Sequence, residues 1–205
     1  LIKCVGATGK PVLLSCGMAS LVEIEEAVQV LRQSGTNDIV LLKCTSTYPC
    51  PPEELNLRTV PDMAATFGLP VGLSDHSMGY AAAVAAVSLG ACVVEKHLTL
   101  RRSDGGPDSA FSMEPEEFAE MVKAARFVER ALGGIHYGPT ESEKTSVLYR
   151  RSLFVCEPIV AGELLTEKNV RSIRPGAGMH TRHFVEIIGR RARRPLEKGT
   201  PLSWD

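Results

Sequence analysis

The sequence predicts an α/β protein in which parallel strands alternate with helices, and three observations support this fold class. Short apolar segments that end in polar residues alternate with helical segments through residues 11–132. Residues 71–100 hold the clearest unit, an apolar strand, an alanine-rich helix and a second apolar strand. Strands that are apolar throughout are typical of a parallel sheet covered by helices, and polar residues at their carboxyl ends are typical of α/β enzymes.

Four strand–helix units follow one another along the chain. Strands are expected at residues 10–14 and 38–43, and from residues 71 and 92 onward; helices are expected after residue 20, at 57–67, near 81–87 and at 114–132. Ser20, with Glu23 three residues later, forms a capping box, which marks a helix start. Gly68 marks a helix end, because glycine adopts the left-handed conformation that closes many helices.

The repeat length suits either a doubly wound sheet or a (β/α)8 barrel. No GxGxxG follows any strand, which disfavours a dinucleotide-binding fold. Four units are half of a barrel, and the sequence opens on Leu1 with residues typical of a helix end. We therefore expect the C-terminal half of a barrel, with the first half preceding it.

The composition changes after the last predicted helix. Residues 135–149 are expected to form a linker, and residues 150–205 contain short apolar segments separated by Gly-rich turns, which indicates a small β-rich domain. Residues 150–205 hold 11 Lys/Arg and 6 Asp/Glu, whereas residues 1–149 hold 12 and 18. The first domain is expected to span residues 1–134. The net charge is positive in residues 150–205 and negative in residues 1–149, which suggests that the two parts attract each other or share an anionic ligand.

The composition also bounds the class of protein. Hydrophobic residues make up 44% and charged residues 23% of the chain, as in globular proteins, and no apolar run approaches the roughly 20 residues that span a bilayer. The six cysteines form no CxxC pair, and three of them (Cys16, Cys44 and Cys92) lie in or beside apolar strands, where we expect buried free thiols. These features favour a cytoplasmic protein with no membrane partner. The arginine cluster at 190–194 lacks interleaved aromatic residues, so we expect no nucleic-acid partner.

His76 and His97 are the strongest candidates for chemistry. Each is expected at the carboxyl end of one of two consecutive parallel strands, which lie about 5 Å apart. A single histidine at a strand end is more often a hydrogen-bonded structural residue, but two at one edge can meet over a metal ion. A structural zinc site is disfavoured because four closed ligands are absent from the pattern.

The motifs together resemble a known family. LLSCGMAS, LLKCTSTYPCP, GLSDHS, EKHLTL, GPDSAFSM and RSLFV…GELLTEKNV…IRPGAG are similar, in this order, to the sialic acid synthases. These are phosphoenolpyruvate-dependent condensing enzymes with a (β/α)8 barrel followed by a small antifreeze-like (SAF) domain. Within the family, PDSAFSM and GMHTRHFVEIIG look more like pseudaminic acid synthases than N-acetylneuraminate synthases.

The resemblance implies a reaction and its partners. C3 of phosphoenolpyruvate joins the aldehyde carbon of an N-acetylated amino sugar, an oxocarbenium ion forms at C2, water adds, and phosphate leaves by C–O cleavage. The implied acceptor is a 2,4-diacetamido-trideoxy altrose, with the acceptors of N-acetylneuraminate and legionaminic acid synthases as alternatives. The implied cofactor is a divalent ion, Mn2+ before Mg2+ or Co2+, and the implied assembly is a domain-swapped homodimer. The family's first four units carry a catalytic glutamate and substrate-binding lysines, which have no counterpart here.

The resemblance also assigns roles to individual residues. His76 and His97 match the metal ligands and thus the catalytic centre. Three serines that each follow a strand match positions that bind phosphoenolpyruvate: Ser15, Ser46 and Ser74. Each serine alone is equally compatible with capping the next helix; three at one edge form a cradle for an anion.

Four further residues match positions that contact the sugar: Tyr48, Glu95, Asp108 and Arg174. Each has a plainer alternative. Tyr48 is compatible with loop packing, Glu95 with a buried ion pair to Lys96 or another base, Asp108 with a turn, and Arg174 with a solvated basic surface. A rival of another class is a non-catalytic fragment whose SAF domain recognises carbohydrate.

Overall fold

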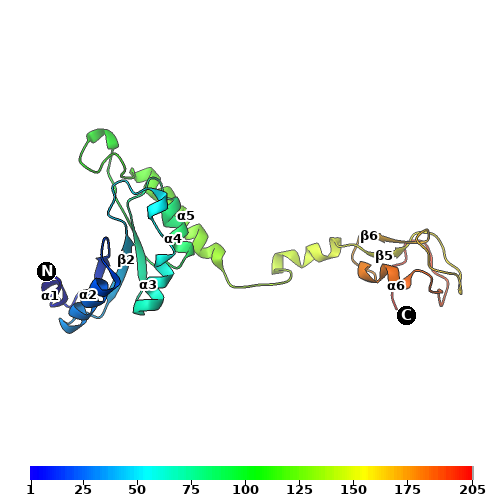
Figure 1. The fold of residues 1–205 in the computed structure, drawn as a ribbon. Helices are drawn as coiled ribbons and strands as arrows, with labels where there is room; N and C mark the ends of the chain where they lie inside the picture. Colours follow the sequence, from blue (N-terminus) through cyan, green and yellow to red (C-terminus); the bar gives the residue numbers. More distant parts are fainter. Residues whose placement is uncertain (205) are drawn as a thin grey trace. The chain divides into compact units, whose positions relative to one another are not determined.

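The computed structural model describes residues 1–204, which form two compact units, one ending at Gly134 and the other beginning at Ile135 (Figure 1). Asp205, the last residue of the predicted 150–205 domain, lies outside the described residues. Within residues 1–204, no helix is both long enough and apolar enough to cross a membrane.

The first unit is built on one parallel sheet. Its strands are β1 (Val12–Ser15), β2 (Ile39–Cys44), β3 (Val71–Asp75) and β4 (Val94–Lys96), hydrogen-bonded in the order β1-β2-β3-β4. The helices are α1 (Ile2–Gly6), α2 (Leu21–Gln33), α3 (Thr59–Phe67), α4 (Ala81–Ser88) and α5 (Pro115–Leu132). Strands and helices therefore alternate as predicted, and all three strand pairs are parallel.

The helix boundaries follow from local chemistry. The Ser20 backbone N–H donates to Glu23 Oε2 at 2.7 Å, and Ser20 Oγ accepts from the Glu23 backbone N–H, so the predicted capping box begins α2. Helix α3 ends at Gly68, whose φ of 60° is the left-handed conformation that glycine adopts at little cost. Both predicted helix signals are confirmed.

The main core lies between the sheet and its helices. Leu41 and Leu73, from β2 and β3, are fully buried in a cluster with Leu31 of α2 and Val60 of α3. All five residues of β3 are buried. Burying one such leucine contributes about 1.5–3 kcal/mol. This apolar layer fixes which face of each strand points toward the helices.

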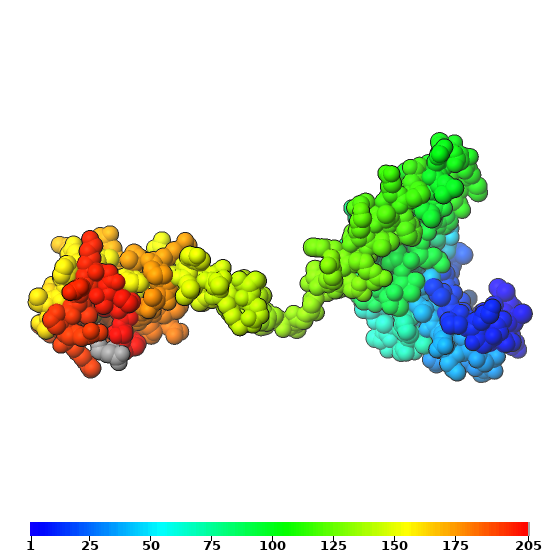
Figure 2. Space-filling view, turned by 180° about the vertical axis from the view of Figure 1, so that it is seen from behind, coloured from blue at the N-terminus to red at the C-terminus, as the bar shows by residue number. Residues whose placement is uncertain are grey.

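The second unit has the predicted β character. Strands β5 (Ser152–Val155) and β6 (Val170–Ile173) pair in antiparallel fashion, and isolated bridges join the remaining short segments. Figure 2 shows yellow and red segments of this unit packed against each other. The Val155 N–H donates to the Thr200 carbonyl at 3.0 Å. The core of this unit contains Leu153, Val155 and Val170.

Four details differ from the predictions. The 135–149 segment contains two 3-10 helices, Glu141–Glu143 and Thr145–Tyr149, and a short helix, α6 (Phe184–Ile187), lies in the second unit. Residues 49–55 form the proline loop, where the prolines at 49, 51 and 52 predict a rigid loop rather than a helix start, and it contains a 3-10 turn, Pro52–Glu54. Such turns need only local i→i+3 hydrogen bonds, and proline suits their first position. All six cysteines are free, as expected, but of the three expected to be buried, Cys16 and Cys44 are only partly buried, and Cys92, which precedes β4, is exposed.

Candidate functional site

The candidate site lies at the carboxyl edge of the parallel sheet. The register pairs Cys44 with Ser74, and Ser74 with Glu95, across β2, β3 and β4. Successive side chains along a strand point to opposite faces. Because Leu73 belongs to the helix-side core, Ser74 and His76 project from the opposite face, the one that forms the interior of a barrel.

The two candidate metal ligands lie next to each other at this edge. The ring centroids of His76 and His97 are 5.2 Å apart and the rings are inclined at 70°. His76 is buried, whereas the His97 side chain is 31% exposed. Because one imidazole is buried and the other is partly exposed, the site is packed against the protein on one side and accessible to solvent on the other.

A polar group lies next to each ring, and a hydrogen bond sets the orientation of His76. His76 Nδ1 lies 2.9 Å from the carbonyl oxygen of Thr45, and a carbonyl only accepts hydrogen bonds. Nδ1 therefore carries a proton, and in the neutral form of His76 the lone pair is on Nε2. His97 Nδ1 lies 3.7 Å from Asp108 Oδ2. A carbonyl or carboxylate behind each imidazole is the usual support for a metal-ligating histidine.

This arrangement fits a divalent metal with two protein ligands. The free Nε2 of His76 and the imidazole of His97 would bind it, and among residues 1–204 no group of three or more His, Cys, Asp or Glu side chains could do so. Two imidazoles do not make a closed structural zinc site. The remaining positions would go to substrate oxygens and water, and a metal so bound polarises a carbonyl oxygen.

Aromatic side chains line the same site. The Tyr48 ring lies 4.1 Å from the His76 ring and 5.9 Å from the His97 ring. Phe111, which the sequence analysis did not select, lies 5.1 Å from the His97 ring and 5.9 Å from the Tyr48 ring. Phe111 lies in the same GPDSAFSM motif as Asp108, so this motif could have identified Phe111 as a residue of the site. Tyr48 thus packs on the histidines rather than only on its own loop.

Ser74 and Glu95 are bonded to each other. Ser74 Oγ donates to Glu95 Oε1 at 2.6 Å. Ser74 was predicted to bind phosphoenolpyruvate, and Glu95 was predicted to contact the sugar. The residues predicted for the two substrates therefore meet at one edge of the sheet. The alternative that Glu95 pairs with Lys96 is wrong, because adjacent strand residues point to opposite faces and Lys96 is bonded to Asp75 instead.

None of the three selected serines caps the helix that follows it. The N-cap of α2 is Ser20, that of α3 is Arg58, and that of α4 is Tyr80. The capping alternative is therefore wrong for Ser15, Ser46 and Ser74. Ser46 Oγ lies against Gly17, where an added Cβ would come within 2.3 Å of it. Gly17 thus leaves room for this hydroxyl at the edge.

Arg174 belongs to the second unit, directly after β6. It is exposed, and its loop is anchored by Ser152 Oγ, which donates to the Pro175 carbonyl at 2.7 Å. Gly178 must be glycine, since a Cβ there would lie 2.5 Å from the Leu153 carbonyl. These contacts hold the backbone of the loop that carries Arg174. The predicted contact of Arg174 with the sugar stays a prediction.

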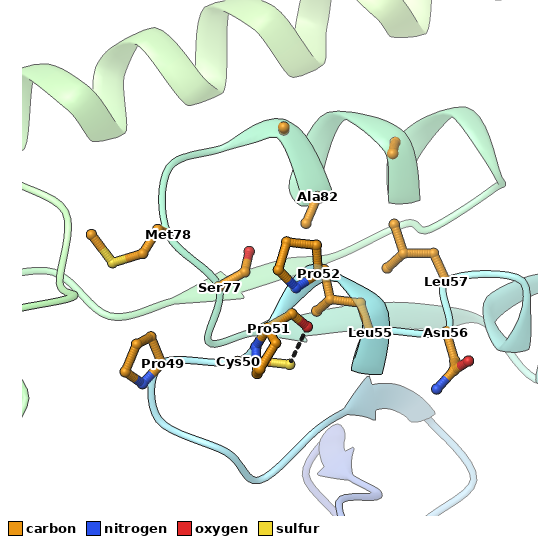
Figure 3. Close-up of a pocket in the computed structure, with 12 residues that line it drawn as sticks. Pro49, Cys50, Pro51, Pro52, Leu55, Asn56, Leu57, Ser77, Met78 and Ala82 are labelled. Atoms are coloured by element: carbon orange, nitrogen blue, oxygen red, sulfur yellow. Dashed lines mark hydrogen bonds between the residues drawn. The ribbon is translucent and has the colours of Figure 1, made fainter.

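A separate cavity of about 660 Å³ lies between the proline loop and α4 (Figure 3). Pro52 and Leu55 project toward Ala82 of α4, and Cys50 Sγ donates to the Pro51 carbonyl at 3.4 Å. Its lining is mostly apolar and contains no charged side chain. It offers neither a cationic side chain nor a histidine to an anionic substrate, so the site at the sheet edge is the better candidate.

The cysteines give a prediction for chemical labelling. Burial raises the pKa of Cys16 to about 11, so its thiol stays protonated at neutral pH, and thiolates rather than thiols are alkylated. With iodoacetamide at pH 7.5, we expect the exposed Cys4 and Cys92 to be modified while Cys16 is not. Peptide mass spectrometry gives the rates; equal rates for Cys16 and Cys4 would show that the described environment of Cys16 is incorrect.

Known proteins share this arrangement of segments. Residues 1–137 match the NeuB family, and residues 150–205 match the SAF domain. The chain belongs to the NeuB family. The predicted resemblance is thereby confirmed, and so is the predicted fold class, a parallel half barrel followed by an SAF domain.

Two relatives that the chain matches are named as synthases of pseudaminic and legionaminic acids. The chain is 41% identical to pseudaminic acid synthase of Helicobacter pylori, over 100% of this chain and 61% of that protein. It is 38% identical to N,N'-diacetyllegionaminic acid synthase of Campylobacter jejuni, over 92% of this chain and 58% of that protein. The chain thus spans about 60% of the length of these relatives.

Solved structures in the NeuB family have the same fold. The chain is similar to the spore coat polysaccharide biosynthesis protein of Bacillus subtilis, with a TM-score of 0.61 and 34% identity over 100% of this chain and 63% of that one. It is also similar to the sialic acid synthetase of Leptospira borgpetersenii solved with citrate, with a TM-score of 0.65 and 34% identity over 71% of this chain and 51% of that one.

Proposed function

We propose that the protein carrying this chain condenses phosphoenolpyruvate with an N-acetylated amino sugar to give a nine-carbon keto-sugar acid of the pseudaminic type. The observation that carries the proposal is the pair of imidazoles 5.2 Å apart at the carboxyl edge of the sheet. Active sites of α/β barrels are built at that edge. Residues 1–134 then act as the C-terminal half of the barrel, 135–149 as the linker and 150–205 as the SAF domain.

Each residue has a role in this proposal. The hydroxyls of Ser15 and Ser46 donate hydrogen bonds to the phosphate and carboxylate oxygens of phosphoenolpyruvate. Ser74 has a single hydroxyl proton, which it donates to Glu95 in this structure, and it would exchange that bond for one to phosphoenolpyruvate when the substrate binds. Tyr48 and Asp108, which flank the histidines, contact the sugar. These groups hold the two reactants in contact, and such positioning lowers the barrier to a bimolecular step.

Glu95 and the metal complete the site. The Glu95 carboxylate accepts from Ser74 Oγ at 2.6 Å and can accept equally from a sugar hydroxyl. A divalent ion held by His76 and His97 supplies electrophilic activation of the sugar aldehyde when bound, and Mn2+ suits imidazole combined with oxygen ligands.

The acceptor is the finer part of the proposal. Its support is the 41% identity to the H. pylori pseudaminic acid synthase, together with the similarity of 107–113 and 178–189 to that group. The legionaminic alternative rests on a comparable 38% identity. Discrimination would come from polar groups in the pocket that are left unpaired by the wrong sugar.

An assay of phosphate release from phosphoenolpyruvate tests both the condensation reaction and the identity of the acceptor sugar. We expect kcat/KM for the altro-configured diacetamido sugar to exceed that for N-acetylmannosamine by roughly 10²-fold or more, with the diacetamido acceptor of the legionaminic series as the matched control. A preference for either control sugar would overturn the pseudaminic assignment. Carbohydrate binding without phosphate release would instead support the non-catalytic alternative.

A further inference from the structure

A buried ion pair lies behind the candidate site, on the helix side of the sheet. Lys96 Nζ is 2.8 Å from Asp75 Oδ2, and their side chains are 1% and 0% exposed. The two residues are register partners across β3 and β4. The pair therefore links the carboxyl ends of the two strands that carry the histidines.

Ser77 closes the network around this pair. Asp75 Oδ1 accepts from the Ser77 backbone N–H at 2.8 Å and from Ser77 Oγ at 2.7 Å. Lys96 Nζ donates to the Ser77 carbonyl at 2.6 Å. Both carboxylate oxygens are thus used, and within residues 1–204 no buried side-chain polar atom lacks a partner.

The network brackets both candidate metal ligands in the sequence. Asp75 and Ser77 stand on either side of His76, and Lys96 directly precedes His97. Alternation along the strands sends the ion pair to the helix side and the imidazoles to the opposite side. The distance between the two backbone positions that hold the imidazoles is therefore fixed by three hydrogen-bonded side chains behind them.

Stability alone gives a weak reason for this pair. Leu73, which lies on the same face of β3 as Asp75, is fully buried in the apolar core. Taking two charges out of water is costly, and replacing a buried ion pair by apolar residues of similar volume is often neutral or stabilising. Metal ligands, in contrast, must be held within about 0.5 Å of their working positions by supporting residues.

We propose that Asp75 and Lys96 are positioning residues that set the spacing of His76 and His97 for metal binding. This inference rests on the proposed metal role of the two histidines. The pair does not touch substrate or metal; it acts through the backbone of the residues that do.

The test is a double variant that removes the charges together, Asp75→Leu/Lys96→Met, made in the full protein. We expect it to melt within a few degrees of wild type but to bind Mn2+ roughly 10–100-fold more weakly by calorimetry, as is typical when support behind a metal ligand is lost. The matched control, Glu120→Gln/Lys123→Gln, removes an exposed ion pair on α5 and should bind Mn2+ as wild type does.

Three outcomes separate this inference from the proposed function. If His76→Ala loses Mn2+ binding while the folded Leu/Met variant binds normally, the positioning role is wrong and the metal role stands. If wild type and His76→Ala bind Mn2+ equally, the metal role itself fails. If the Leu/Met variant does not fold, Asp75→Asn/Lys96→Gln replaces it; wild-type affinity in that variant, or its failure to fold, would overturn the positioning role.

Discussion

Replacing either His76 or His97 by alanine is expected to lower the rate of phosphate release by roughly 10³-fold or more. A metal ion stabilises transition-state charge by several kcal/mol, and about 4 kcal/mol corresponds to three factors of ten in rate. Activity is measured in the full protein with saturating phosphoenolpyruvate and acceptor. The fold should persist, because His97 is partly exposed and its ring contacts are confined to the sheet edge.

Two controls accompany the histidine variants. His136→Ala changes an exposed histidine of the segment after α5 and should leave activity unchanged. A chelator should reduce wild type to the level of the variants, and added Mn2+ should restore wild type alone. Full wild-type activity in chelator would contradict the metal role.

Replacing Arg174 by alanine is the second large expected effect. The arginine stands on the anchored loop after β6, in a unit whose 150–205 sequence carries 11 Lys/Arg and 6 Asp/Glu. Losing a charged hydrogen bond to a bound sugar costs about 1.5–3 kcal/mol, or roughly 10–100-fold in KM for the sugar. KM for phosphoenolpyruvate should change little, and equal changes in both would contradict the assignment.

Subunit mixing then tests whether Arg174 acts on a partner chain, as the predicted domain-swapped dimer requires. His76→Ala and Arg174→Ala subunits are combined under exchange conditions. If the arginine acts in trans, each mixed dimer has one site with both defects and one intact site, so activity returns. If it acts within its own chain, every site keeps a defect and no activity is recovered. The His76→Ala/His97→Ala mixture is the matched control without recovery.

Sequence periodicity predicted the sheet because its strands are apolar over consecutive residues and then turn polar. Leu73 and Ser74 illustrate this: the first is buried against the helices, and the second begins the polar edge. A parallel sheet places residues at the ends of neighbouring strands close together. The sequence alone could therefore predict that His76 and His97 are neighbours.

Contacts between distant segments could not be predicted in this way. Phe111 reaches the histidines because its loop returns to the sheet edge through the bridge between Leu98 and Met113. An ion pair of Lys96 with its neighbour Glu95 was one alternative, and the true partner of Lys96, Asp75, depends on the register of β4 against β3. Register and loop return are set by packing of the whole unit, which single-sequence patterns do not encode.

The most direct test of metal binding by His76 and His97 is pulsed electron paramagnetic resonance of Mn2+ bound to the full protein in the presence of phosphoenolpyruvate. We expect nitrogen couplings from two histidine ligands and a phosphorus coupling from the substrate. His76→Ala or His97→Ala should weaken Mn2+ binding and leave at most one nitrogen coupling. A wild-type spectrum without histidine nitrogen couplings, or one unchanged by either substitution, would contradict a metal-dependent phosphoenolpyruvate site at the edge of this sheet.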